Sequence, residues 1–322
     1  MGVDKSKISN MIDYMKNADE GELKNLDKEY YNVLILRERE RKIQSVINDY
    51  GESQFYIAFS GGKDSCVLSE LIDWAIPDNQ IPRVFVDTGI ELNIIRNFVY
   101  DLAEKDERII IIKPTKNVKQ TLDNYGYPFK SKVFSSYVYR FRRSGLTKSV
   151  KVFCGIGEKK WSPGFSCPAK LKYLFKDKNA TSFPISMRCC VEMKEKPMIK
   201  WQRENENKIP IIGIMQDEGG GRNNSNCMNF KDDELKSFQP LVKVTKEWED
   251  WFILNFDIKI CDIYKEPYNF PRTGCKGCPF NFKLQHELDI LEKYFPEERK
   301  QCEIIWGPVY DEYRRIGYRL NK

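Results

Sequence analysis

Histidine is almost absent from this chain: there is one, His286, in 322 residues. Mechanisms that need a histidine base, and metal sites built from several histidines, therefore have almost no raw material here. The tendency of polar side chains to stay in water predicts that His286 occupies a solvated helix position. Long apolar runs are also missing. No stretch approaches the roughly 18–20 residues that span a bilayer, so we expect no membrane association.

The amino-terminal residues, MGVDKSKISNMIDYMKN, lack the apolar core of a secretory signal. We therefore expect a cytoplasmic protein. Ten cysteines in such a chain are not expected to form a disulfide framework, because the cytoplasm keeps thiols reduced. Metal ligation or thiol chemistry is the better interpretation. With 41% hydrophobic and 13% aromatic residues, the chain has enough apolar material for a substantial core.

Positive charge is concentrated in one segment, residues 113–178. This segment holds sixteen Lys and Arg against three acids, a net charge of +13, whereas the whole chain carries only +6. Twelve aromatic residues are interleaved there, among them Tyr125, Tyr137, Tyr139, Phe141 and Trp161. Two interpretations stay open. The segment binds a phosphorylated or nucleic-acid substrate by neutralising phosphates and stacking bases, or it is a solvated surface over a small core of its own.

Short strand patterns and helix patterns alternate along residues 54–113. The runs FYIAF, RVFV and RIIII favour strands, while CVLSELIDWA and LNIIRNFVYDLAEK have helical spacing. This alternation predicts an α/β fold, a parallel sheet with helices on both faces. IPIIGIM (209–215) predicts a further strand. Ligands of such sheets bind beyond the carboxyl ends of the strands.

The rest of the chain surrounds this pattern. We expect a helical lead-in at residues 1–50, the α/β domain with the basic aromatic segment at 51–285, and a helical carboxyl-terminal segment at 286–322. NFKDDELKSF (229–238) is interpreted as a polar linker. Thr245 and the apolar residues after it predict a capped amphipathic helix.

A glycine-rich turn separates the first predicted strand from the first predicted helix. Glycines there let successive N–H groups approach an anion, and the helix amino terminus adds a favourable dipole. A lysine and two serine hydroxyls complete the set of phosphate ligands. The residues are Ser60, Gly61, Gly62, Lys63, Asp64 and Ser65. Cys66, the next residue, is expected to pack in the core.

These six residues do not form a Walker A loop, G-x-x-x-x-G-K-[ST]. In their strand–loop–helix context they resemble the signature of the PP-loop ATP pyrophosphatases. The resemblance implies that the loop, with Lys63 and Asp64, grips the β- and γ-phosphates of ATP while a substrate oxygen attacks the α-phosphate and pyrophosphate leaves, with Mg²⁺ offsetting the charge. A turn after the second strand resembles the family's second nucleotide-binding turn; its residues are Asp87, Thr88 and Gly89.

Four of the cysteines form two pairs. Cys189 and Cys190 are adjacent, and Cys275 and Cys278 form a Cys-x-x-Cys within RTGCKGCPF. Four thiolates from two loops are a donor set for a 4Fe–4S cluster and also for structural zinc. Adjacent cysteines crowd a small tetrahedral ion more than they crowd a larger cubane, so the spacing favours iron–sulfur but leaves zinc open.

The order of the motifs, SGGKDS, FVDTG, CCVEMK, a Glu-x-x-x-Arg loop, PL…T…W and RTGCKGCP, resembles the phosphoadenylyl-sulfate reductase-like branch of the PP-loop superfamily over about residues 50–282. In the adenylyl-sulfate reductases and the DNA-phosphorothioation enzymes of this branch, the four cysteines bind one 4Fe–4S cluster. The resemblance therefore favours the cluster over zinc. It also implies that Lys194 contacts substrate anion or cluster, and that Arg222, with Glu218, contacts substrate phosphate or nucleotide.

Two departures from the sulfonucleotide reductases shape the functional hypothesis. The carboxyl-terminal Cys-Gly-Leu-His is missing, and the phosphate loop, which reductases tend to degrade, is intact. Both favour an ATP-dependent sulfurtransferase that receives sulfur from a donor such as a cysteine desulfurase and delivers it to tRNA, DNA or a small metabolite.

Two alternatives remain to this sulfurtransferase hypothesis. One is a sulfonucleotide reductase that uses a thiol elsewhere in the chain, such as Cys154, Cys167 or Cys302, any of which could instead carry sulfur. The other is a nucleic-acid-binding component of a modification or defence system, in which the nucleotide site is regulatory.

Overall fold

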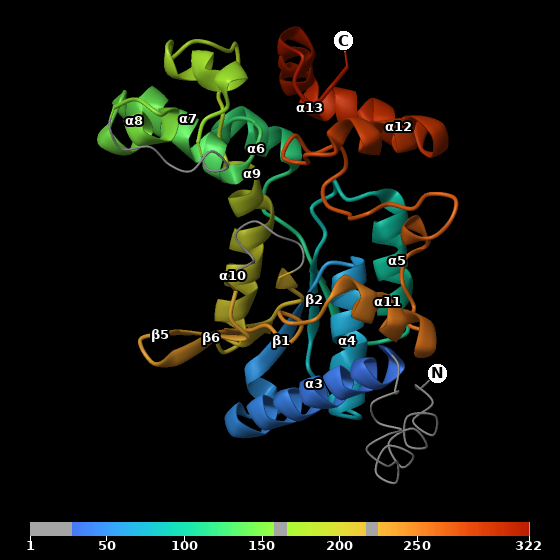
Figure 1. Cartoon of the computed structure of the whole chain (residues 1–322). Helices are drawn as coiled ribbons and strands as arrows, with labels where there is room; N and C mark the ends of the chain where they lie inside the picture. Colours follow the sequence, from blue (N-terminus) through green and yellow to red (C-terminus); the bar gives the residue numbers. More distant parts are fainter. Residues whose placement is uncertain (1–27, 158–165, 217–224, 322) are drawn as a thin grey trace. The chain divides into compact units, whose positions relative to one another are not determined.

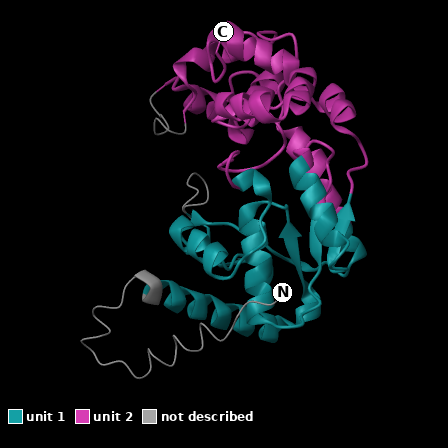
Figure 2. Ribbon diagram, turned by 90° about the vertical axis from the view of Figure 1, so that its right-hand side faces the viewer, with its two compact units in different colours: residues 1–85, 94–112, 201–264 teal, residues 86–93, 113–200, 265–322 magenta. Residues whose placement is uncertain are grey.

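The computed structural model describes residues 28–157, 166–216 and 225–321. Within these ranges, no helix is long and apolar enough to cross a membrane. The chain forms two compact units, coloured separately in Figure 2. Unit 1 comprises residues 1–85, 94–112 and 201–264, and unit 2 comprises residues 86–93, 113–200 and 265–322.

The six strands form one sheet, in the order β3-β2-β1-β4-β6-β5, which lies almost entirely within unit 1. β1 pairs in parallel with β2 and β4, β4 pairs in parallel with β6, and β5 pairs antiparallel with β6. This confirms the predicted α/β class with a largely parallel sheet. The strands are β1 (Phe55–Phe59), β2 (Arg83–Val86), β3 (Ile109–Ile112), β4 (Ile209–Ile211), β5 (Met228–Lys231) and β6 (Glu234–Phe238).

Side chains on β1 alternate between the two faces of the sheet. Phe55, Ile57 and Phe59 join the main apolar core, to which several neighbouring helices contribute, whereas Tyr56 packs edge-on against Trp201 of another helix, with ring centroids 5.1 Å apart. Because successive strand residues point to opposite faces, helices cover both faces, as predicted. The main-core helices include α3 (Lys28–Tyr50), α4 (Lys63–Ala75) and α11 (Lys246–Asn255), and the helix of Trp201 is α10 (Lys196–Glu204) (Figure 1).

The segment interpreted as a polar linker is instead a β-hairpin, so that prediction was wrong. β5 and β6 are joined by Asp232 and Asp233, which both have positive φ, 53° and 60°. Two left-handed residues make the kind of turn whose twist matches the flanking strands, and aspartate tolerates this conformation better than most residues. The polar character of the segment reflects a solvated edge strand.

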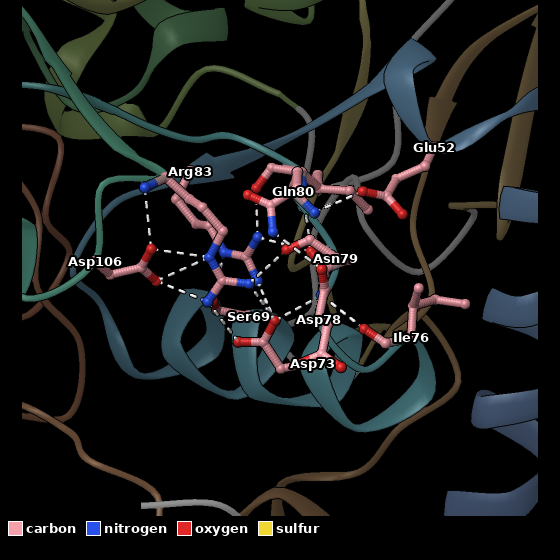
Figure 3. Close-up of polar contacts among 11 residues, drawn as sticks. Glu52, Ser69, Asp73, Ile76, Asp78, Asn79, Gln80, Arg83 and Asp106 are labelled. Carbon is pink, nitrogen blue, oxygen red and sulfur yellow. Dashed lines mark hydrogen bonds and ion pairs between the residues drawn. The ribbon is translucent and has the colours of Figure 1, made fainter.

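A buried polar cluster around Arg83 ties the start of β2 to the end of α4 (Figure 3). The Arg83 guanidinium is 1% exposed and donates to Ser69 Oγ at 3.1 Å and Asn79 Oδ1 at 2.9 Å, and it pairs with Asp73. Arg108 pairs with the same Asp73 at 2.8 Å. The charged groups are therefore each matched by an opposite charge or a hydrogen bond, as burial demands.

Among the described residues, unit 2 has helices and short turns and no strand of its own. Thr121 on its first helix contacts Met193 in the turn after the paired cysteines. The elements are α6 (Val118–Tyr125), α7 (Lys132–Ser144), α8 (Lys148–Cys154), η3 (Ala169–Phe175), α9 (Arg188–Cys190), η4 (Val191–Glu195), α12 (Leu284–Tyr294) and α13 (Pro296–Ile316). In unit 1 the remaining elements are η1 (Glu52–Gln54), α5 (Asn93–Ala103) and η7 (Asp262–Tyr264).

Aromatic residues of the basic segment form the core of unit 2. The Phe153 ring stacks on Tyr137, with centroids 4.1 Å apart, and contacts Phe134 and Phe175 edge-on. These rings are buried and are not free to stack on bases, whereas Tyr139 is 52% exposed. For most of the described aromatic residues, the structure therefore supports the second interpretation, a core of its own beneath a charged surface. Trp161 lies outside the described residues.

Helices are present where they were predicted near the two ends of the chain, within the described residues. α3 accounts for residues 28–50 of the expected helical lead-in, and residues 1–27 lie outside the described part. α12 and α13 form the expected carboxyl-terminal helices, and His286 is exposed on α12 as predicted. α11 begins after Thr245, whose hydroxyl accepts from the Trp248 N–H at 3.3 Å, which confirms the predicted cap.

Candidate functional site

The phosphate loop connects β1 to the first turn of α4 in unit 1. Ser65 Oγ donates to the Gly62 carbonyl at 2.8 Å and accepts from Ser60 Oγ at 3.1 Å and from the Ser60 N–H at 3.2 Å. Ser60 Oγ in turn accepts from the Gly62 N–H at 3.3 Å. The two serines thus hold the turn together from its two ends. The loop conformation is fixed before any ligand binds, which lowers the entropy lost on binding.

Gly61 is the residue that allows this turn. Its φ is +68°, a left-handed conformation that other residues rarely adopt. A Cβ atom there would lie 2.5 Å from Val99 Cγ2 and 3.2 Å from Ile95 Cγ2 on α5. Because both neighbours belong to a packed helix, no side chain fits, and the glycine is required by conformation and by space.

Lys63, the lysine of the loop, is held by two acids of α11. Its Nζ lies 2.8 Å from Glu249 Oε2 and 2.8 Å from Asp250 Oδ1. Burial alone would lower the pKa of Lys63, but the hydrogen bonds to Asp250 and Glu249 outweigh it and raise that pKa. The ammonium group is therefore fully charged at neutral pH and is available to a phosphate only if it exchanges these partners.

Glu249 is a completely buried carboxyl, with 0% exposure. Burial raises its pKa to about 7, and the negative charge of Asp64 adds to the rise, against the opposing effect of Lys63. A paired carboxyl usually has a lowered pKa, so desolvation prevails here over the ion pair. Such a carboxyl changes its charge near neutral pH, beside the loop that carries Lys63 and Asp64.

The predicted second nucleotide turn, Asp87–Gly89, belongs to unit 2 and is closed by its own side chains. Asp87 Oδ1 accepts from the Gly89 N–H at 3.1 Å, and Glu91 accepts from the Thr88 N–H at 3.0 Å and from its hydroxyl at 2.7 Å. Gly89 has φ +76°. Glu91 was not singled out by the sequence. Its position three residues after a turn threonine was the available signal, because an acid there can accept from the turn.

The same turn is bonded directly to the Cys-x-x-Cys loop. Glu91 and Cys275 form an antiparallel bridge, and the Lys276 N–H donates to the Ile90 carbonyl at 2.7 Å. Lys194 Nζ lies 3.5 Å from Glu91 Oε1 and hydrogen-bonds the Cys275 thiol. The charge of Cys275 is the largest cause that raises the pKa of Lys194. One lysine therefore links the predicted nucleotide turn to a predicted cluster ligand.

All four predicted ligand cysteines belong to unit 2 and interact electrostatically. Burial raises the pKa of Cys278 well above the ordinary value, and the charges of Cys275, Cys190 and Cys189 add to the rise. Burial likewise raises the pKa of Cys189, with further contributions from Cys275 and Cys190. The pKa of Cys275 is raised to about 11 by burial, although Lys194 opposes the rise. The two cysteine pairs are thus brought into one neighbourhood.

The four thiols do not converge as tightly as a single ion requires. In residues 28–157, 166–216 and 225–321, no group of three or more His, Cys, Asp or Glu side chains is arranged to hold one metal ion. Zinc–sulfur bonds of about 2.3 Å would require such convergence. Four thiolates as a donor set are common to structural zinc and to a 4Fe–4S cluster.

The carboxyl-terminal helices hold the Cys-x-x-Cys loop in place. Trp306 Nε1 donates to the Lys276 carbonyl at 2.9 Å, Tyr313 OH donates to the Pro279 carbonyl at 3.0 Å, and the Tyr310 hydroxyl donates to the Gly277 carbonyl. Lys276 itself is buried and paired with Glu298 at 2.9 Å. The sequence predicted these helices but gave no sign that they support the cysteines.

Gly277, between the two cysteines, packs against Cys302 of α13. A Cβ atom at this position would lie 2.4 Å from the Tyr310 hydroxyl and 2.7 Å from Cys302 Sγ, and φ is +59°. Cys302 is fully buried, and burial raises its pKa to about 12. A thiol whose pKa is raised this far stays protonated at neutral pH, which makes it a poor sulfur carrier. Cys66 is also buried in the main core, as predicted.

Four further residues bear on the site: Glu218, Arg222, Glu249 and Asp250. Arg222, predicted to contact substrate phosphate or nucleotide, and Glu218 of the same motif lie outside the described residues. Glu249 and Asp250, which contact Lys63, were missed by the sequence analysis. The available signal was TKEWED, two acids on the predicted capped helix. One of them is buried only because of tertiary packing.

Among curated proteins, the chain is similar to an uncharacterised protein of Methanocaldococcus jannaschii, with 27% identity over 290 residues. That match covers 87% of this chain and 54% of the relative, so this chain spans about half the length of the relative.

Three solved structures are also similar. The phosphoadenylyl-sulfate reductase from Candida auris is 11% identical, with a TM-score of 0.40, and the match covers 74% of this chain and 91% of that one. The NH₃-dependent NAD synthetase from Campylobacter jejuni is 11% identical, with a TM-score of 0.38 and coverages of 92% and 99%. The U34-tRNA thiolase NcsA from Methanococcus maripaludis, with its [4Fe–4S] cluster, is 17% identical, with a TM-score of 0.36 and coverages of 88% and 80%. At these TM-scores the resemblances establish no residue role in this chain.

The family model for the phosphoadenosine phosphosulfate reductase domain matches residues 54–148 and 168–281, well over half of the chain. The matched ranges contain the phosphate loop and all four paired cysteines. The chain belongs to the phosphoadenosine phosphosulfate reductase domain family, the branch of the PP-loop superfamily that its motifs predicted.

Proposed function

We propose that this chain is an ATP-dependent sulfurtransferase. It adenylates an oxygen of its substrate with release of pyrophosphate and then replaces the adenylated oxygen with sulfur, aided by a 4Fe–4S cluster on Cys189, Cys190, Cys275 and Cys278. The observation that carries the proposal is the bonding in unit 2, where the Asp87–Gly89 turn and the Cys-x-x-Cys loop form one hydrogen-bonded structure through Glu91 and Lys194.

On the nucleotide side, the loop N–H groups and Lys63 bind the β- and γ-phosphates. Lys63 leaves Glu249 and Asp250 for phosphate, since an ammonium ion exchanges one set of anionic oxygens for another at little electrostatic cost. The carboxylates that Lys63 leaves, together with Asp64, are oxygen ligands of the kind that Mg²⁺ prefers. The loop thus neutralises the charge that develops on the leaving pyrophosphate.

On the sulfur side, the four thiols suit an iron–sulfur cluster. Without metal their raised pKa values keep them protonated at neutral pH, so cluster binding releases protons. A bound cluster, with one of these cysteines on each iron, would supply electrons to the sulfur chemistry beside it rather than an open iron site. Lys194 supplies positive charge beside Cys275, which favours the thiolate and any anionic substrate that approaches it.

The proposal is tested by anaerobic purification followed by iron and sulfide counts, a visible spectrum and an ATP assay with candidate acceptors: tRNA, DNA and small carbonyl compounds. We expect about four irons and AMP with pyrophosphate as products. Formation of ADP, or a protein without iron that still thiolates, would contradict the proposal.

Cys275→Ser and Cys227→Ser form a matched pair for this test. Cys275 is a proposed ligand, while Cys227 is half-buried in unit 1. We expect the first variant to lose the iron and the second to retain it. Equal iron content in both variants would remove Cys275 from the ligand set.

The family itself favours a second candidate function, reduction of adenylyl sulfate or phosphoadenylyl sulfate. The matched model is named for that reaction, and thiols outside the cluster set are present in unit 2. Release of sulfite from either sulfonucleotide in the presence of a reducing thiol, with no turnover of ATP, would decide for reduction and against the transferase.

A further inference from the structure

Two cysteines outside the proposed cluster set contact each other. Cys154 is the last residue of α8, and Cys167 lies thirteen positions further along the chain. Their side chains interact, the Cys167 thiol donates to the Pro168 carbonyl at 3.5 Å, and each residue is 4% exposed. The sequence offers each of them separately, as a reductase thiol or a sulfur carrier, with no sign that the two meet.

The backbone holds this pair in place. The Cys167 N–H donates to the Phe153 carbonyl at 2.8 Å, so the two chain segments are bonded next to the thiols. Gly155 ends α8 in the left-handed conformation, with φ +70° and ψ 32°, and the Phe153 ring is stacked on Tyr137. Packing around Phe153 and the helix end at Gly155 therefore hold Cys154, and the main-chain hydrogen bond to Phe153 holds Cys167 beside it.

The two thiols are electrostatically different. The side-chain interaction with Cys167 lowers the pKa of Cys154, burial opposes this fall, and the Lys172 cation lowers the pKa further. The same interaction, together with burial, raises the pKa of Cys167. One member is thus suited to be the thiolate and the other to remain a thiol, an asymmetry typical of reactive cysteine pairs.

We propose that Cys154 and Cys167 form a redox-active dithiol that exchanges with external disulfides. The pair lies in unit 2 among Lys130, Lys172 and the aromatic core, and it is a site additional to the four paired cysteines. Disulfide exchange at this pair needs neither ATP nor iron, so its test is independent of the proposed sulfurtransferase activity.

The exchange balances in two steps. The Cys154 thiolate attacks one sulfur of an external disulfide, the external S–S bond breaks, and one external thiolate leaves with the proton that Cys154 had lost. Cys167 then gives up its proton and attacks Cys154 Sγ, and the second external thiol leaves. Two protein thiols have lost two electrons to form one disulfide, and the external disulfide has become two thiols. A reducing dithiol reverses both steps.

The test uses the full chain, purified anaerobically and equilibrated with mixtures of reduced and oxidised glutathione. Free thiols are alkylated, the protein is digested, and linked peptides are identified by mass spectrometry. We expect a Cys154–Cys167 disulfide that forms as the mixture becomes more oxidising, the loss of two alkylatable thiols, and full recovery of both with dithiothreitol. Parallel samples with oxidised thioredoxin show whether a protein disulfide oxidises the pair faster than the small disulfide of glutathione does.

Cys154→Ser and Cys167→Ser should each abolish this crosslink, while Cys227→Ser, the control, should preserve it. Because the crosslink is mapped in the wild-type chain, the test does not depend on how well the variants fold. Alkylation of both thiols at every glutathione ratio, a disulfide to a different cysteine, or a crosslink that dithiothreitol does not reverse would overturn the proposal.

Discussion

Unit 1 contains two buried charged clusters, one at each end of α4, which differ in how completely their charges are paired. At the carboxyl end of the helix, Arg83 is satisfied by Asp73, Asn79 and Ser69. At the amino end, Lys63 pairs with Glu249, a fully buried carboxyl that also lies beside the negative charge of Asp64. The first cluster is electrostatically complete, and the second is not.

The difference indicates a division of roles. A buried charge with a full set of partners holds its neighbours in one arrangement and has no reason to change. A buried carboxyl with a pKa raised to about 7, next to a lysine that also has an exposed acid partner, is close to two states. Incompletely satisfied buried groups are common at functional sites. The first cluster therefore serves the fold, and the second serves the phosphate loop.

The largest expected effect comes from breaking the complete cluster. Arg83→Met removes the buried hydrogen bonds to Asn79 and Ser69 and leaves Asp73 with Arg108 as its remaining cation, so it should destabilise the protein by about 3 kcal/mol, measured by urea denaturation. Arg37→Met, which removes a partly exposed pair with Glu40, should lower stability by no more than about 1 kcal/mol. Similar losses in both variants would show that Arg83 contributes no more than a surface pair.

Lys63→Met should reduce pyrophosphate release by about 10²–10³-fold, the usual effect of removing one transition-state charge contact. Its effect on stability should be smaller than that of Arg83→Met, because Glu249 can become protonated when its partner is lost. Lys236→Met, at an exposed hairpin position, is the control and should leave the rate unchanged. A full rate in Lys63→Met would contradict the assigned role of the loop.

Glu249→Gln should change how stability depends on pH. Between pH 4.5 and 7 the folded state keeps a proton on Glu249 that the unfolded chain has lost, so stability falls as pH rises through this window. At about 1.4 kcal/mol per pH unit, wild-type stability should fall by about 2 kcal/mol from pH 5.5 to pH 7 relative to Glu249→Gln.

Asp250→Asn, which alters the exposed partner of Lys63, should keep the wild-type pH profile. Parallel unfolding curves for wild type and Glu249→Gln across this range would mean that Glu249 titrates normally.

The smallest expected effect comes from removing two helix caps, one in each unit. Thr245→Ala removes the cap of α11, the helix that carries Glu249 and Asp250, and Ser131→Ala removes the cap of α7 in unit 2. Each should lower stability by about 1 kcal/mol. Only Thr245→Ala should also weaken ATP binding, measured by calorimetry. Equal ATP affinities in the two variants would show that the position of α11 does not influence the loop.

Local patterns were enough for much of the fold. β1, the phosphate loop and α4 follow from an apolar run, two glycines and a helical repeat that are contiguous in the chain, and the Thr245 cap depends on an atom three residues away. The hairpin at Asp232 and Asp233 was missed because its turn lacks the usual Asn-Gly or Asp-Gly signal. The aromatic residues of the basic segment were ambiguous because composition does not tell which side of a helix faces inward.

The sequence by itself determined the family, the parallel sheet and the identity of the chemical groups: a lysine and serines in a glycine turn, and cysteines in pairs. Only the tertiary structure decided which groups meet. It brought Asp250 to Lys63 across 187 positions, Glu91 to Cys275, and the Cys154 thiol to that of Cys167. It also set the pKa values, because the free energy of a charge depends on how much water and which neighbours surround it, and burial is a property of the folded chain.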